Sequence, residues 1–113
     1  MKKVEIKKGD VIFEIGERNN YFFIIKDGFV DIFTSVKNIP SLVEVDMLKP
    51  GDFIGEVSFF DNKPSPVKII AKTACTLLMY TREDMVKNEK DTKDIFDALL
   101  FSICKKYRAQ LKL

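Results

Sequence analysis

Short segments in which apolar and polar residues alternate fill the first two thirds of the chain. The alternation is clear over 11–15, 30–36 and 43–47, where it has the period of two that a half-buried β-strand shows. Residues 21–25 form a continuous apolar run, which favours a strand covered on both faces, although a buried helical turn fits the same residues. Turn-forming residues separate these segments at 8–10, 16–20, 26–28, 37–41 and 49–52. The pattern predicts an antiparallel barrel or sandwich, whose turns use Gly9, Gly16, Gly28 and Gly51.

After residue 80 the spacing of the apolar residues changes from two to three and four. Thr81 is expected to cap a short helix over 82–88, with Asp84 as its capping-box partner. Asp91 or Thr92 is expected to cap a longer helix, whose apolar stripe consists of Ile95, Phe96, Leu99, Leu100, Ile103, Tyr107 and Leu111. The stripe has two interpretations. It packs on the strands of its own chain, or it forms a two-helix dimer seam, although its spacing follows a heptad only loosely.

The length and composition are those of one ordinary globular unit. At 113 residues the chain is expected to form a single domain, with a β-barrel over 1–80 and helices over 81–113. Hydrophobic residues make up 46% of the chain and charged residues 32%, so it has enough apolar side chains to build a core.

The charge distribution gives no reason to expect a nucleic-acid or membrane partner. The formal net charge is +2, and the cationic cluster of Lys105, Lys106, Arg108 and Lys112 lies near the end of the predicted long helix, where cations complement the helix C-terminus. No apolar run approaches the roughly 20 residues needed to cross a bilayer, and no apolar signal segment follows Met1. We therefore expect a cytoplasmic protein.

The chain contains no histidine, so it lacks the commonest general base and the commonest metal ligand. Cys75 and Cys104 are too few and too far apart for a disulfide framework or a metal-binding pair, and both are expected to pack inside a protein of a reducing compartment. No catalytic triad or phosphate-cradling loop of the P-loop type is present. The sequence therefore predicts no enzyme, no catalytic residue and no metal site.

A series of short motifs occurs in order along residues 8–85: Lys8-Gly9-Asp10, Gly16-Glu17, Tyr21-Phe22-Phe23-Ile24-Ile25-Lys26-Asp27-Gly28, Gly51-Asp52-Phe53-Ile54-Gly55-Glu56 and Ala71-Lys72-Thr73-Ala74-Cys75. This series resembles the cyclic nucleotide-binding domain family. The resemblance implies a mainly β fold, a jelly-roll barrel of the double-stranded β-helix type with C-terminal α-helices. It also implies a regulatory function in signalling, with cyclic AMP or cyclic GMP as the candidate ligand and no other cofactor.

Residues 55–58 resemble the phosphate-binding cassette of that family, in which a glycine-glutamate pair opens a short helix. The resemblance implies that Glu56 accepts a hydrogen bond from the ribose hydroxyl, and that the amides of Val57 and Ser58 face the cyclic phosphate. Gly55 has no side chain and lets a phosphate approach those free amides. Structural interpretations exist beside these: Gly55 serves the turn, and Glu56 is stabilised by about 0.3 to 1 kcal/mol at the positive end of the helix.

The sequence departs from the family pattern at Ser65 and Pro66. Counting back from 71–75 without a gap puts Ser65 where the family has its phosphate-binding arginine, and Pro66 where the family has a small hydroxyl or alanine residue. The loss of the arginine removes a charge-assisted hydrogen bond of about 1.5 to 3 kcal/mol. A desolvated phosphate left unpaired raises the total cost to as much as about 5 kcal/mol. This cost corresponds to binding that is roughly ten-fold to several thousand-fold weaker.

Two lysines near Ser65 are candidates for the missing cation. If Ser65 faces the pocket, alternation along the strand points Val67 and Ile69 inward and Lys68 outward. Lys63 lies in the preceding loop and has a flexible stem, but a point charge does not reproduce the bidentate fork of arginine. We expect neither lysine to restore full affinity.

Two functions from different classes fit the sequence. The first is a non-enzymatic regulatory or sensor domain that binds a small ligand, a cyclic nucleotide weakly or another compound, in a pocket formed by 55–58, Ser65 and Pro66. Binding then moves the helix from Ile95 to Leu111. The second is a degenerate domain that binds no nucleotide and acts as a protein-interaction or dimerisation module, a homodimer for example, through that helix. The chain is expected to be a free-standing sensor domain or a fragment of a longer protein.

Overall fold

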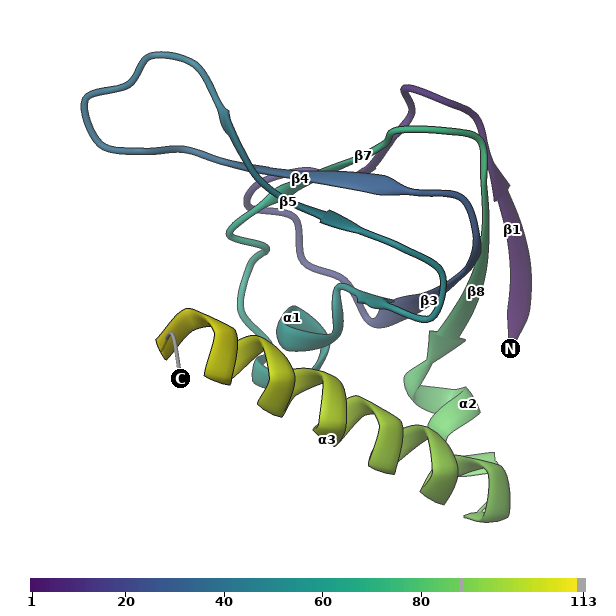
Figure 1. Cartoon of the computed structure of the whole chain (residues 1–113). Coiled ribbons are helices and arrows are strands. Elements are labelled where there is room, and N and C mark those ends of the chain that lie inside the picture. The colour runs from purple at the N-terminus through teal and green to yellow at the C-terminus, as the bar shows by residue number, and fades with distance from the viewer. Residues whose placement is uncertain (88, 112–113) are drawn as a thin grey trace.

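Two four-stranded antiparallel sheets, stacked on a shared core, form the body of the protein (Figure 1). The computed structural model describes residues 1–87 and 89–111, without the side chains of 86–92 and 110–111. The first sheet, in spatial order, contains Lys2–Ile6 (β1), Cys75–Thr81 (β8), Tyr21–Asp27 (β3) and Phe53–Ile54 (β6). The second contains Val11–Phe13 (β2), Lys68–Ala71 (β7), Val30–Thr34 (β4) and Val43–Leu48 (β5).

This architecture confirms the predicted fold class, a mainly β jelly-roll with C-terminal helices. In the described residues each strand pairs only within its own sheet, so the body is two stacked sheets and not the closed barrel that we expected. The edge strands range from two residues in β6 to six in β5. The sheets are therefore joined by the apolar core between them and not by hydrogen bonds from edge to edge.

Two strands are shorter than the alternation predicts. β2 ends at Phe13, just before the turn into β3. β4 ends at Thr34, because the following residues form a turn in which the amide of Ile39 donates to the carbonyl oxygen of Val36 at 3.0 Å. Asn38 takes a left-handed φ of 70° in this turn. Apolar residues continue the alternating pattern into the turn, and the pattern alone does not mark the end of the strand.

β3 is buried on both faces, as its continuous apolar run predicted. Phe23 and Ile25 point into the core between the sheets, whose other buried members are Phe13, Val30, Leu48, Ile54, Ile69, Ala71, Cys75 and Leu77. Phe22 points the opposite way, into a second cluster with Phe53, Phe59, Met85 and Leu99. The helices therefore cover the outer face of the first sheet.

The three helices are α1 (Glu56–Asp61), α2 (Arg82–Lys87) and α3 (Glu89–Leu111). The predicted capping box at the start of α2 is confirmed. The amide of Asp84 donates to Thr81 Oγ1 at 3.1 Å, and the amide of Thr81 donates to Asp84 Oδ2 at 2.9 Å. This reciprocal pair satisfies amides that the helix leaves without a partner.

α3 begins earlier than predicted. It starts at Glu89, so Asp91 and Thr92, the expected caps, lie inside the helix, and their side chains are outside the described ones. Residue 88, the predicted end of α2, is also outside the described residues. Glutamate and lysine are strong helix formers, and Glu89 and Lys90 extend α3 toward its N-terminus.

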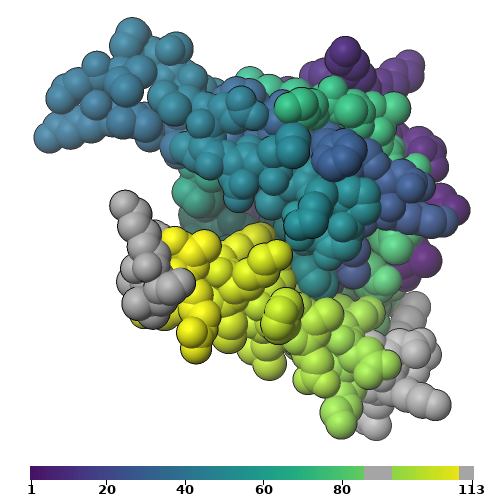
Figure 2. Space-filling model, viewed as in Figure 1, coloured from purple at the N-terminus to yellow at the C-terminus, as the bar shows by residue number. Residues whose placement is uncertain are grey.

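α3 lies along one side of the two-sheet body (Figure 2). Ile95 and Leu99 pack into the second cluster, and Leu99 is only 1% exposed. The exposed members of the predicted stripe are Phe96, Leu100 and Tyr107, and the side chain of Leu111 is outside the described ones. Packing on the chain's own sheet thus accounts for one part of the stripe and leaves another part in solvent. No helix in the described part of the chain is long and apolar enough to span a membrane.

Gly28, in the turn from β3 to β4, should tolerate no side chain. Its φ is +94°, and a Cβ there would lie 2.4 Å from the carbonyl oxygen of Ala74, whereas Gly9 has a φ of +88° and nothing within 4 Å of that position. We predict that Gly9→Ala lowers the free energy of unfolding by about 1 kcal/mol through backbone strain alone. Gly28→Ala should cost about 1 to 3 kcal/mol more through overpacking. Urea denaturation measures both losses, and equal losses would contradict the steric contribution at Gly28.

Candidate functional site

A cavity of about 190 Å³ lies between α1, the segment that precedes β7, and α3. All six residues predicted for the pocket line it, namely Gly55, Glu56, Val57, Ser58, Ser65 and Pro66. The rest of the lining is apolar apart from one lysine, and consists of Ile32, Leu48, Phe53, Ile54, Val67, Ile69 and Lys106. The fold therefore brings the two predicted segments together and adds a residue from α3.

Gly55 is the residue before α1, and the backbone conformation and the ring of Phe13 explain why this residue is glycine. It has a φ of +78°, and a Cβ at this position would lie 2.6 Å from Cε2 of Phe13. The carbonyl oxygen of Gly55 accepts a hydrogen bond from the amide of Phe59 at 3.1 Å, which starts the helix. The fold thus requires a glycine here without any ligand, which supports the structural interpretation of Gly55.

The carboxylate of Glu56 is buried, with 1% of the residue exposed, and its partner is Lys106 of α3. Lys106 Nζ donates to Glu56 Oε1 and lies 3.4 Å from the carbonyl oxygen of Phe53. A buried carboxylate without a partner is costly, so this ion pair stabilises Glu56 in the cavity wall. The pair also connects α3 to the first turn of α1.

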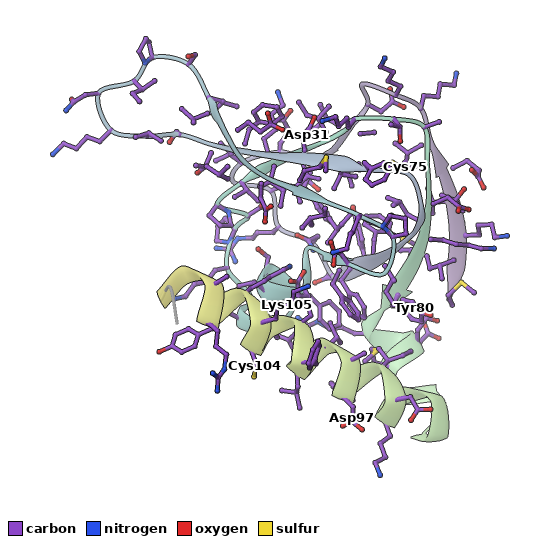
Figure 3. The ribbon with its side chains drawn as sticks, viewed as in Figure 1. Asp31, Cys75, Tyr80, Asp97, Cys104 and Lys105 are labelled. Atoms are coloured by element: carbon purple, nitrogen blue, oxygen red, sulfur yellow. The ribbon has the colours of Figure 1, made fainter. Side chains whose placement is uncertain are left out.

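The role of Lys106 was missed by sequence analysis, which grouped this residue with the solvated cations near the helix end. Its neighbours Lys105, labelled in Figure 3, and Arg108 are exposed as that interpretation requires. Lys106 instead follows Leu99 by seven residues, a spacing that places both side chains on the same face of a helix. This spacing from a core leucine was the signal in the sequence.

The wall formed by residues 64–67 has no hydrogen-bond donor left for a ligand. The amide of Ser65 donates to the carbonyl oxygen of Glu17 at 2.8 Å, and Ser65 Oγ donates to the carbonyl oxygen of Val67 at 2.8 Å. The amide of Val67 donates back to Ser65 Oγ at 3.3 Å. The two prolines of this segment have no N–H group. The wall therefore offers a ligand neither a cation nor a free donor.

The two lysines that the sequence placed near Ser65 are both absent from the cavity lining. Ile69 is buried in the core and Val67 packs against it, whereas Lys68 Nζ lies 3.4 Å from Glu14 Oε1, so the predicted alternation is confirmed. Lys63 lines a different cavity, together with Arg18 and other polar residues. Neither lysine supplies a cation to the predicted pocket.

The residues whose pKa values are shifted do not line this cavity. Figure 3 labels one of them, Cys75, and also Asp31, the neighbour of Glu44. Burial raises the pKa of the Cys75 thiol, which packs in the core as predicted, whereas Cys104 is exposed, contrary to our expectation. A hydrogen bond to Asp31, and then the Asp31 charge, raise the pKa of Glu44. Among the described residues no group of three or more metal-ligating side chains is placed to hold a metal ion.

Two stacked jelly-roll sheets, a short helix that opens on a glycine, and a cavity covered by a C-terminal helix define the structural class of the domain, a jelly-roll with a small lined cavity. A family model described as "Cyclic nucleotide-binding domain" matches residues 3–87, and the chain belongs to this family. The match spans both sheets, α1 and α2, and ends just before α3.

Known proteins resemble the chain over part of their own length. A curated relative, the "cAMP-dependent protein kinase regulatory subunit" of Eremothecium gossypii, is 32% identical over 72 residues, which are 64% of this chain and 14% of that protein. The catabolite activator protein of Thermus thermophilus has a TM-score of 0.83 at 21% identity, covering 98% of this chain and 52% of that chain. The regulatory subunit of a cAMP-independent protein kinase A from Trypanosoma brucei has a TM-score of 0.71 at 22% identity, covering 97% and 40%. At these identities the two solved structures support the fold alone.

Removing Lys106 should destabilise the protein through Glu56. We predict that Lys106→Met lowers the free energy of unfolding by about 1 to 3 kcal/mol, because the buried carboxylate loses its partner. The double variant Glu56→Gln/Lys106→Met should recover most of this loss, because no charge is then left unpaired. Lys105→Met, at an exposed neighbour, should change stability by less than about 0.5 kcal/mol.

Urea denaturation of these variants and of Glu56→Gln completes a double-mutant cycle. If the double variant is as unstable as the sum of the two single variants, the two side chains are not coupled, and the ion pair does not stabilise the fold.

Proposed function

We propose that the protein is a non-enzymatic, cytoplasmic regulatory domain that binds a cyclic nucleotide weakly and signals through α3. The observation that carries the proposal is the position of Glu56, a buried carboxylate in the wall of a cavity, held by a lysine of the C-terminal helix. A carboxylate in this position is ready to accept a hydrogen bond from a sugar hydroxyl. Any ligand that takes this bond acts directly on the contact of α3.

The size of the cavity supports a signal that involves movement of α3. Its volume is about 190 Å³, below the roughly 300 to 1,000 Å³ of typical small-molecule pockets. α3 contributes Lys106 to the lining, whereas the other lining residues belong to the sheets, α1 and the connecting segments. A nucleotide therefore needs α3 to shift, and binding favours the shifted arrangement through a difference in affinity between the two states.

Weak binding follows from the wall at 64–67. That wall supplies no cation and no free donor, so a cyclic phosphate loses a charge-assisted contact of about 1.5 to 3 kcal/mol. The names of the relatives do not decide the matter, because one belongs to a cAMP-dependent kinase and another to a cAMP-independent one. We therefore infer the ligand from the cavity residues of this chain and not from the names of its relatives.

Titration calorimetry with cyclic AMP and cyclic GMP at millimolar concentration tests the proposal. We expect measurable but weak binding of at least one of them by the wild-type protein. Ser65→Arg, which introduces a guanidinium at the cavity wall, should bind at least about ten-fold more tightly. Ser41→Arg, which adds the same charge at an exposed position outside the cavity, should bind as the wild type does.

The outcomes separate two explanations. Silence with both nucleotides would remove cyclic nucleotides as ligands and leave only a different compound. A folded Ser65→Arg protein that gains no affinity would mean that the pocket is closed for another reason, such as Pro66.

A second candidate function is self-association through the outer face of α3. Leu100, Phe101 and Tyr107 are 60%, 72% and 61% exposed, and together with Cys104 they form an apolar strip along the helix. Figure 3 shows Cys104 on the side of α3 that faces away from the sheets. Burial of such residues against a second copy would remove apolar surface from water.

Sedimentation equilibrium tests this second function. We expect the wild-type protein to form a concentration-dependent dimer and Phe101→Glu to remain a monomer. Val45→Glu, at an exposed apolar residue of β5, is the matched control and should dimerise normally. A wild-type protein that stays monomeric at high concentration, and that retains no partner on an affinity column, would rule out this function.

A further inference from the structure

The cavity has one source of positive charge in the described part of the chain, the Lys106 ammonium group. The segment 64–67 contains no cation, and its donors are used within the protein. Lys63 and Lys68 face other parts of the surface. An anionic ligand that enters this cavity therefore meets a buried carboxylate and a single ammonium group, which are paired with each other.

The side chain of Lys106 has the freedom to exchange one hydrogen-bond acceptor for another. Its side chain is 39% exposed, whereas that of Glu56 is 2% exposed, so the lysine side chain has room to move and the carboxylate does not. An ammonium group carries three donors on a flexible four-carbon stem, and Nζ already approaches a second acceptor, the carbonyl oxygen of Phe53, at 3.4 Å. A small rotation of the stem can carry one donor to a new acceptor in the same cavity.

We propose that Lys106 is the anion-binding residue of this pocket. A hydroxyl group of the ligand donates to Glu56 and takes over part of the role of the lysine, and the ammonium group then pairs with the anionic group of the ligand. After the exchange the carboxylate keeps a hydrogen-bond donor, the hydroxyl, and the ammonium keeps an anionic partner, so neither charged group is left without a hydrogen bond. The ligand class is thus an anion that carries a hydroxyl group close to its charge, such as a ribose phosphate ester.

This assignment rests on the proposed function and adds a consequence to it. In this chain the cation for the phosphate comes from α3, about 40 residues after the wall at 64–67, and not from that wall. A ligand without the hydroxyl leaves Lys106 on Glu56 and gains no cation. Recognition of the sugar and recognition of the anion are therefore coupled through one lysine.

Calorimetry with cyclic AMP and its 2′-deoxy analogue tests the assignment on four proteins: wild type, Lys106→Met, Lys106→Arg and the exposed control Lys105→Met. We expect Lys106→Met to bind cyclic AMP at least about ten-fold more weakly, which is about 1.4 kcal/mol. Lys106→Arg should stay within about three-fold of the wild type, because it keeps the charge, and Lys105→Met within about two-fold. The wild-type protein should prefer cyclic AMP to the deoxy analogue, and added salt should weaken its binding more than that of Lys106→Met.

The double variant Glu56→Gln/Lys106→Met is the control for a loss of stability. It has no unpaired charge and should stay folded, yet it should bind cyclic AMP as weakly as Lys106→Met does. If the wild type binds and Lys106→Met binds equally well or more tightly, Lys106 only holds the cavity shut, and this assignment is wrong while the proposed function stands. If the wild type binds neither cyclic nucleotide, both fail.

Discussion

The burial of β3 on both faces is the constraint on which the rest of the structure depends. Phe22 and Phe23 are neighbours in sequence, yet they belong to different apolar clusters, one under the helices and one between the sheets. The ring of Phe22 lies 5.0 Å from that of Phe59 in α1 and 5.4 Å from that of Tyr80 in β8. Because such a strand needs a layer on each side, α1 and α3 must lie against the first sheet, and the cavity forms where they meet.

The Glu56–Lys106 pair is a second constraint, which acts through charge. Leu99 holds α3 on the sheet by apolar contact, and seven residues further along the helix Lys106 reaches a carboxylate that has almost no access to water. A buried ion pair adds little to stability compared with a well-packed apolar pair, but the loss of one partner is expensive. The pair therefore sets the position of α3 more than it strengthens the fold, and any ligand group that competes for Glu56 acts on that position.

Local periodicity predicted the strands β2 to β5, and cap preferences predicted the capping box at Thr81. The grouping of 55–58 with Ser65 and Pro66 came from the resemblance to the family. These features depend on residues close in sequence or on a family pattern. The contact between Glu56 and Lys106 joins residues 50 apart. The spacing from Leu99 places Lys106 on the buried face of α3, but no local pattern identifies Glu56 as its partner. The start of α3 was misplaced because Asp91 and Thr92 are good caps that also fit inside a helix. The closed barrel was not found because alternation reveals which face of a strand is buried and does not reveal which strands pair.

The residues of the cassette differ in what they say about a ligand. Gly55 is required by the ring of Phe13, which lies where its Cβ would be, so a glycine here supports the fold whether or not the pocket binds anything. The hydroxyl of Ser65 donates to the carbonyl oxygen of Val67 and accepts from the amide of Val67, so these groups are satisfied without a ligand. Glu56 is the exception, because a buried carboxylate in an otherwise apolar cavity has a cost that the fold offsets only with a lysine from another element. Stability alone does not require this charge, and the proposal that the cavity binds a ligand therefore rests on Glu56 more than on any other residue of the cassette.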